Sequence, residues 1–135
     1  VPNHCEAVFN NCIVDRLYAW SHSMITLTNS KLMYIRCSTH NNSYSKAHLT
    51  IGPGTVVDEI VVTSSGLAKK VKDENGKYHW IDDPANRWAP SLIIKSGATV
   101  NVLDMNGRKY YDKKDSLDVI IEKGAIVKEI INLAE

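Results

Sequence analysis

A glycine-centred motif that occurs three times constrains the fold of this chain more than any other feature. Its copies span residues 49–60, 92–103 and 119–130. Alignment on the three glycines, Gly54, Gly97 and Gly124, brings apolar residues into register: Ile51 with Ile94 and Ile121, Val57 with Val100 and Val127, and Ile60 with Leu103 and Ile130. Alternating apolar residues on both sides of a glycine predict a strand, a tight corner and a second strand.

A unit of this kind has an apolar face that it cannot bury alone. Copies spaced by tens of residues bury that face by stacking, as solenoid proteins do. The step from Gly54 to Gly97 is longer than the step from Gly97 to Gly124, so insertions of unequal length interrupt the coils. A short solenoid leaves unpaired strands and a thin core, which three chains around one axis would cover. The predicted fold class is therefore all-β, with parallel β-helix or solenoid coils, inserted β-hairpins, and three chains intertwined or packed as a trimer.

Two Asn-Gly dipeptides lie in the insertions. Asn75 with Gly76, and Asn106 with Gly107, each stand between two runs that can form strands. Asn-Gly favours the type I′ turn, which matches the twist of paired strands. We predict hairpin insertions at 64–90 and 105–116.

A weaker repeat with one constant offset occupies roughly the first forty residues. The aligned pairs are Phe9 with Leu27, Asn11 with Asn29, Val14 with Leu32, Leu17 with Ile35, and Ala19 with Cys37. Amide side chains both donate and accept hydrogen bonds, so aligned asparagines can link one coil to the next. We predict the end of a broad β-helix over 1–43 and a glycine-cornered solenoid section over 44–135.

The last segment also fits a helix. Its apolar residues could share one helical face: Leu117, Ile120, Ile121, Val127, Ile130, Ile131 and Ala134. Gly124 and the β-branched residues favour strands instead. The match to the two earlier copies of the motif decides for strands.

Composition indicates a folded chain. A length of 135 residues with 44% hydrophobic content is enough for one domain with its own core. The formal net charge of +1 provides no field for nucleic acid, and no apolar run approaches the roughly 20 residues that span a bilayer. We therefore expect no nucleic acid partner and no membrane insertion. The odd number of cysteines, Cys5, Cys12 and Cys37, fits reduced thiols in a chain that folds in a cytosol.

The asparagine-containing segments 7–14 and 24–32, followed by the Ile-x-x-Gly units, resemble the right-handed parallel β-helix of bacteriophage tailspikes and pectate-lyase-like proteins. The likeness is to the C-terminal portions of those spikes. It implies a homotrimer in the virion tail, outside the cell after folding in the host cytoplasm. It also implies attachment to, or cleavage of, a bacterial surface polysaccharide. No catalytic motif of the family carries over to this chain.

The first insertion concentrates aromatic and polar residues between positions 78 and 88. Flat aromatic rings cover the apolar faces of sugars, while carboxylate and guanidinium groups bond to sugar hydroxyls. We predict a carbohydrate-binding site made of Tyr78, Trp80, Asp82, Asp83, Arg87 and Trp88. The structural alternative is that both tryptophans pack over the coils or against a neighbouring chain.

No catalytic residue, metal site or cofactor is predicted. Two carboxylates about 5 to 10 Å apart could cleave a glycosidic bond. Asp82 and Asp83 are adjacent, so their side chains diverge in an extended segment. Asp58 with Glu59, and Asp112 with Asp115, fit surface turns equally well. The sequence pairs no carboxylates across coils, where Glu6, Asp15 or others could meet in space. The histidines are dispersed and the cysteines lack the spacing of a zinc site.

Three functions remain open. The first is a structural, trimerising and host-attachment module of a spike that recognises bacterial surface polysaccharide. The second is a fragment of a polysaccharide depolymerase, a hydrolase or a lyase, whose carboxylates meet in a groove between coils or subunits. The third is a solenoid interaction domain of a bacterial surface protein.

Overall fold

Strands make up the regular structure of this chain. The computed structural model describes residues 6–19, 23–39, 47–64, 68–82, 92–112 and 117–134. They form β1 (Glu6–Asn10), β2 (Ile13–Ala19), β3 (Met24–Thr28), β4 (Lys31–Thr39), β5 (His48–Ile51), β6 (Val56–Ser64), β7 (Ala68–Lys72), β8 (Tyr78–Asp82), β9 (Leu92–Ile94), β10 (Thr99–Arg108), β11 (Tyr111–Asp112), β12 (Leu117–Ile121) and β13 (Ile126–Leu133). No helix occurs in these ranges, hence none that could cross a membrane.

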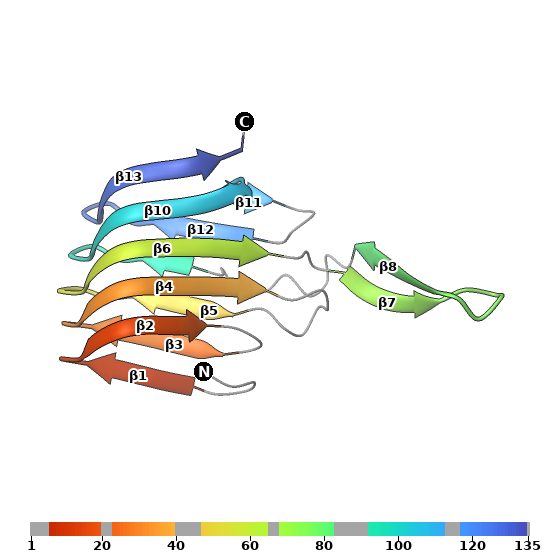
Figure 1. Ribbon diagram of the computed structural model, residues 1–135, viewed down its shortest axis with the longest axis horizontal. Helices are drawn as coiled ribbons and strands as arrows, with labels where there is room; N and C mark the ends of the chain where they lie inside the picture. Colours follow the sequence, from red (N-terminus) through yellow and green to blue (C-terminus); the bar gives the residue numbers. More distant parts are fainter. Residues whose placement is uncertain are drawn as a thin grey trace.

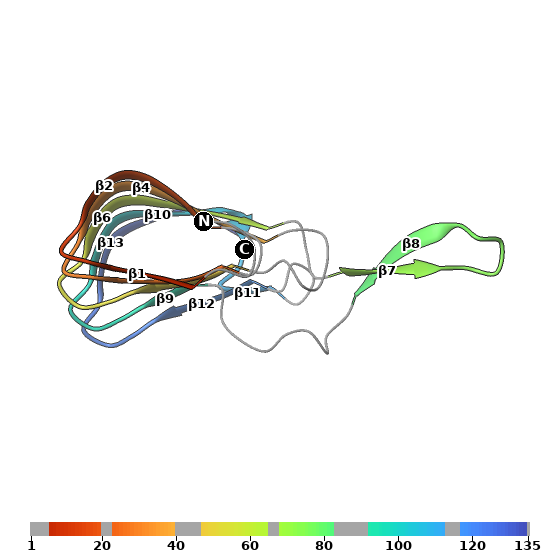
Figure 2. The same cartoon turned by 90° about the horizontal axis from the view of Figure 1, so that it is seen from below.

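Most of the strands belong to two parallel sheets, and the chain alternates between them (Figure 1). Sheet 1 has the order β1-β3-β5-β9-β12-β11, and sheet 2 has the order β13-β10-β6-β4-β2. The pairing of β11 with β12 is antiparallel, while the other neighbours in both sheets are parallel. Sheet 1 is nearly straight and sheet 2 is arched over it (Figure 2). The predicted all-β class is confirmed for the described residues.

We call one strand of sheet 1 and the following strand of sheet 2 a layer. Stacking of the layers follows the register that the repeats predict. Phe9 pairs with Leu27, as the constant offset of the first repeat requires. Val100 lies between Val57 and Val127, its partners in the glycine-centred motif. The alignments are therefore confirmed and the helical alternative for the last segment is wrong, while the division into 1–43 and 44–135 stays a prediction.

The hydrophobic core lies between the two sheets. Each pair of aligned apolar positions becomes a row that crosses several layers, because the side chains of parallel strands in register stack directly. In sheet 2 the fully buried members of two such rows are Leu32, Val57 and Val100, and Ile35, Ile60 and Leu103. Leu27, Ile51 and Ile94 face them from sheet 1. The middle layers thus hold most of the apolar burial.

One left-handed residue recurs in the turn that leads from sheet 1 to sheet 2. Its φ values are 59° at Asn11, 47° at Asn29, 76° at Gly54, 87° at Gly97 and 93° at Gly124. Glycine adopts this conformation without strain, and asparagine tolerates it better than most residues. Asparagine in the first two layers therefore takes the place that glycine takes in the others. The two repeats differ in sequence but form the same turn.

The second Asn-Gly dipeptide does not form the predicted hairpin. Asn106 and Gly107 have φ values of 51° and 75°, but both lie within β10, whose pairing with β13 shifts between Asp104 and Arg108. Asp104 Oδ1 accepts hydrogen bonds from Asn106 N at 2.8 Å and Asn132 Nδ2 at 2.9 Å. This carboxylate holds the irregularity inside the strand. β11, which follows, pairs with β12 instead.

Candidate functional site

The antiparallel hairpin of β7 and β8 stands apart from the two sheets. It forms a two-stranded sheet of its own and projects away from the layers (Figures 1 and 2). Its register places Lys72 opposite Tyr78, and Lys70 opposite Trp80. Because alternate residues of a strand share a face, Tyr78, Trp80 and Asp82 occupy equivalent positions along β8.

The turn of this hairpin differs from the predicted type I′ turn. Asp73 N donates to Lys77 O at 2.8 Å, and Gly76 N donates to Asp73 O at 3.1 Å. Gly76 has a φ of 77°, whereas Asn75 is not left-handed. This is a three-residue loop, a type I turn that ends in a left-handed glycine, rather than a two-residue loop. The side chain of Asp73 is the reason for the difference, because it accepts hydrogen bonds within the loop.

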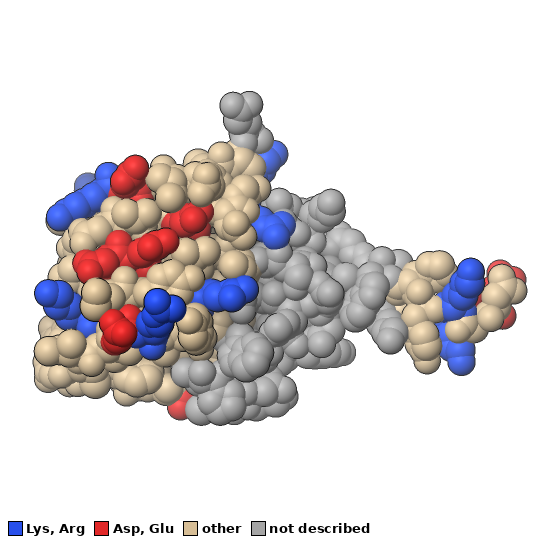
Figure 3. Space-filling view, viewed as in Figure 1, with Lys and Arg blue, Asp and Glu red and all other residues tan. Residues whose placement is uncertain are grey.

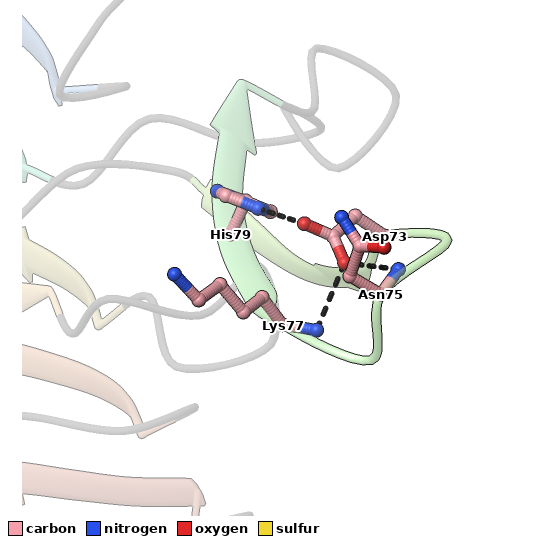
Figure 4. A network of polar contacts seen from close by, with 4 residues as sticks. All are labelled: Asp73, Asn75, Lys77 and His79. Atoms are coloured by element: carbon pink, nitrogen blue, oxygen red, sulfur yellow. Dashed lines mark hydrogen bonds and ion pairs between the residues drawn. The ribbon is translucent and has the colours of Figure 1, made fainter.

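Asp73 organises the loop through three contacts (Figure 4). Its Oδ1 accepts hydrogen bonds from the backbone N–H groups of Asn75 and Lys77, each at 2.9 Å. Its Oδ2 lies 2.6 Å from Nε2 of His79. The hydrogen bond from His79 lowers the pKa of Asp73 most, and the Lys77 and Asn75 amides act in the same direction against desolvation.

Replacement of Asp73 with alanine is expected to loosen the hairpin loop. The amides of Asn75 and Lys77 lose their acceptor, so we expect their hydrogen exchange to become about fivefold faster. Because the folded pKa of Asp73 is lowered, its stabilisation is present above the unfolded value of about 4 and is lost as the pH falls through the folded pKa. Amide exchange measured by NMR checks both statements. The control is Glu74→Ala, and equal effects of the two variants would contradict the role of Asp73.

Of the six predicted glycan-binding residues, the structure describes one in full. Tyr78 is 58% exposed, and Lys72 Nζ lies 5.8 Å from the centroid of its ring. Trp80 and Asp82 are described by their strand positions in β8. Asp83, Arg87 and Trp88 lie outside the described residues. The hairpin therefore places Tyr78, Trp80 and Asp82 at alternate positions of one strand. Glycan binding by the set of six residues stays a prediction.

The lysines of β7 were missing from the predicted site. The register places Lys70 and Lys72 across from the two aromatic positions, so the hairpin combines aromatic and cationic residues. Lysines of a hairpin commonly form a solvated face, so composition alone does not assign them to a site. The Asn75-Gly76 dipeptide predicts a hairpin but not these partners, because a two-residue loop would place Lys72 opposite His79 instead of Tyr78.

The carboxylates considered for catalysis are dispersed. Asp58 and Glu59 lie on β6 and are half-buried, and Asp58 Oδ1 accepts a hydrogen bond from Asn101 Nδ2 at 2.9 Å. Asp15 is exposed on β2 in sheet 2, whereas Glu6 lies on β1 in sheet 1. For Asp112 the structure describes only the strand position, and Asp115 lies outside the described residues. Over sheet 2, acidic and basic side chains are intermingled (Figure 3).

The described residues offer no metal site, since they hold no cluster of three histidine, cysteine or acidic side chains. Cys37 is buried in the core, and Cys12 is half-buried in the first turn. A shallow depression of about 500 Å³ lies over the first turns and includes Cys12. Two residues that line it are joined by a hydrogen bond from Cys12 N to Ser30 Oγ at 3.1 Å, which links the first two layers. We therefore regard the depression as part of the scaffold.

Similarity to proteins of known function could also indicate the role of this hairpin. Comparison of the chain with family models, with curated proteins and with solved structures finds no match in any of the three. The functional assignment therefore depends on the geometry of the hairpin and of the two sheets.

Proposed function

We propose that this chain is a section of a parallel β-solenoid that serves as the structural and glycan-binding module of an extracellular spike. In this proposal the alternating layers are solenoid coils, and the β7–β8 hairpin contacts a bacterial surface polysaccharide. The in-register parallel strands and the stacked left-handed turns support the solenoid. The phage origin, the virion tail location and the trimer are parts of the proposal that come from the family resemblance.

The exposed tyrosine of the projecting hairpin carries the binding part of the proposal. A two-stranded hairpin alone is marginally stable, and this one lies away from the core that could use its aromatic residues. Tyr78 nevertheless keeps 58% of its surface exposed next to Lys72. An exposed ring with a cation at its side fits a sugar that carries a negative charge, since the ring covers the apolar face and the ammonium pairs with the anion.

Replacement of Tyr78 with alanine is expected to weaken binding of acidic polysaccharide fragments by about tenfold, because stacking area and a partner of Lys72 are lost together. Titration calorimetry with capsule or lipopolysaccharide fragments measures the change. The matched control is Tyr18→Ala, which removes a tyrosine that is 48% exposed on sheet 2 instead. Unchanged affinity for Tyr78→Ala, or an equal loss in the control, would contradict a site on the hairpin.

One observation favours the depolymerase as a second candidate. Glu59 and Glu129 stand in one row of sheet 2, each paired with Val102 of the strand between them. Two strand spacings separate them by about 10 Å, close to the separation of carboxylates in inverting glycosidases. New reducing ends in the calorimetry samples would favour this candidate, whereas intact fragments favour binding alone.

The trimer finds support on the outer face of sheet 1. A row without charged residues crosses all five layers there and consists of Val8, Thr26, Thr50, Ile93 and Ile120. Val8 is 68% exposed and Ile120 is 46% exposed. A nearly straight sheet with a β-branched row is a suitable surface for lateral packing of further copies, which would cover these residues.

A further inference from the structure

The last strand of sheet 2 has an open edge. Within the described residues β13 has one neighbour in its sheet, β10. The apolar rows of the core are also less covered at this strand, because Ile130 is 36% exposed, whereas the aligned Ile60 and Leu103 are fully buried. Ile126 is 54% exposed at the start of the same strand. Unpaired backbone groups beside uncovered apolar residues favour the addition of another strand.

Sheet 1 is blocked at the same end of the stack. β11 pairs with β12, with Tyr111 opposite Asp118 and Asp112 opposite Leu117. A complete further layer needs an edge in both sheets, because each layer contributes one strand to each. Only sheet 2 offers that edge in the described structure, so an additional strand in sheet 2 alone is the addition that fits.

The sequence of β13 is complementary to itself when it is read backwards. Residues 126–131 are Ile, Val, Lys, Glu, Ile and Ile. If two copies run antiparallel with the centre between Lys128 and Glu129, each Lys128 lies opposite a Glu129. Val127 then lies opposite Ile130, and both belong to rows that face the core. Within the described residues Lys128 and Glu129 are exposed and make no ion pair.

We propose that β13 pairs antiparallel with β13 of a second copy across a two-fold axis, so that sheet 2 continues from one chain into the other. The contact is isologous, and each interaction therefore occurs twice. It combines backbone hydrogen bonds along both edges, continuation of the apolar rows and two Lys128 to Glu129 pairs. It uses the end of the stack and does not depend on glycan binding or on lateral packing over sheet 1.

A head-to-tail contact between β13 and β2 of another copy is the competing arrangement. It would place Lys128 near Asp15 and Glu129 near Arg16, which is also complementary, since these residues occupy equivalent positions in the register of sheet 2. Sheet 1 opposes it, because β1 would have to pair where β11 already lies on β12. Glu6 would also stand at the level of Asp118, which has the same charge. The two-fold contact brings neither β1 nor Glu6 of the second copy to this end of the stack.

Charge reversal at the centre of β13 distinguishes these arrangements. Lys128→Glu and Glu129→Lys each turn two attractive pairs into two repulsive ones, so we expect the dissociation constant of the paired state to rise about tenfold. The double variant, Lys128→Glu with Glu129→Lys, restores opposite charges in the two-fold contact only, and its dissociation constant should return to that of the wild type. Sedimentation over a concentration series measures the three values.

The control is Lys123→Glu, which makes the same change of charge at an exposed residue of the preceding turn and should leave the dissociation constant unchanged. At concentrations between the dissociation constants of the wild type and the single variants, the wild type should be mostly paired and the single variants mostly unpaired, whether or not copies also pack laterally over sheet 1. A wild type that sediments like the single variants at every concentration would overturn the proposal. A double variant that is as weak as the single ones would overturn it as well and would favour the head-to-tail contact.

Discussion

Replacement of Ile60 with alanine is expected to lower the free energy of unfolding by about 3 to 4 kcal/mol. Ile60 is fully buried in the central layer and stacks between Ile35 and Leu103. Removal of its side chain beyond Cβ leaves a cavity that the neighbouring layers cannot close, since each of them is fixed by its own strand pairing. Urea denaturation followed by circular dichroism measures the change.

The matched control is Ile13→Ala, because it deletes the same atoms from a residue that is 89% exposed on β2. Its effect should stay within about 0.5 kcal/mol. Equal losses for the two variants would mean that the apolar rows are not the core of the protein. A small loss for Ile60→Ala would mean the same.

Replacement of Gly52 with alanine is expected to cost about 3 kcal/mol of unfolding free energy for a different reason. An added Cβ would lie 2.5 Å from Leu27 O and 2.8 Å from Thr28 Cγ2 in the layer below. Gly52 N also donates to that carbonyl oxygen at 2.6 Å. A backbone atom cannot move aside as a flexible side chain can, so the stacking of two layers must open and a hydrogen bond between them weakens.

Gly107→Ala is the control for this effect. An added Cβ there would have no atom within 4 Å, but the φ of 75° makes alanine strained. We therefore expect a loss of about 1 to 2 kcal/mol from the backbone alone. Denaturation curves for both variants separate the two causes. A smaller loss at Gly52 than at Gly107 would contradict the close approach of the layers.

The register of the two sheets could be predicted because it depends on properties of single residues. The rows that contain Val57 and Ile60 are read directly from the alignment of the glycine-centred motif, and the pairing of Phe9 with Leu27 from the constant offset of the earlier repeat. The shared corner was harder to recognise, since asparagine and glycine take the same left-handed position at Asn29 and Gly54. Conformation, and not chemical similarity, unites those two residues.

Features that depend on contacts between distant residues could not be predicted. The dipeptide at 106–107 has the backbone of a tight turn but stays in β10, because Asp104 accepts a hydrogen bond from Asn132 in the neighbouring strand. The loop after β7 follows Asp73 rather than the Asn-Gly rule. The pairing of β11 with β12 had no signal in the sequence, since two residues carry too little periodicity to define a strand.

Composition located the candidate site, and the strand register added residues to it. Clustering of aromatic and acidic residues between positions 78 and 88 pointed to this part of the chain. The cross-strand register added Lys70 and Lys72, which direct the proposal toward acidic glycans. These lysines could not be assigned to the site from the sequence, because the residue opposite each of them depends on the length of the hairpin loop.

In our proposal the layers are a scaffold and the β7–β8 hairpin binds the glycan. The most direct test is an NMR titration of the intact chain with acidic polysaccharide fragments, followed on the backbone amides. We predict shifts concentrated in 68–82, led by Tyr78 and its partner Lys72, with the amides of β4, β6 and β10 unchanged. Shifts concentrated on sheet 2 with none in the hairpin, or no shifts at a saturating concentration of fragments, would contradict the proposal.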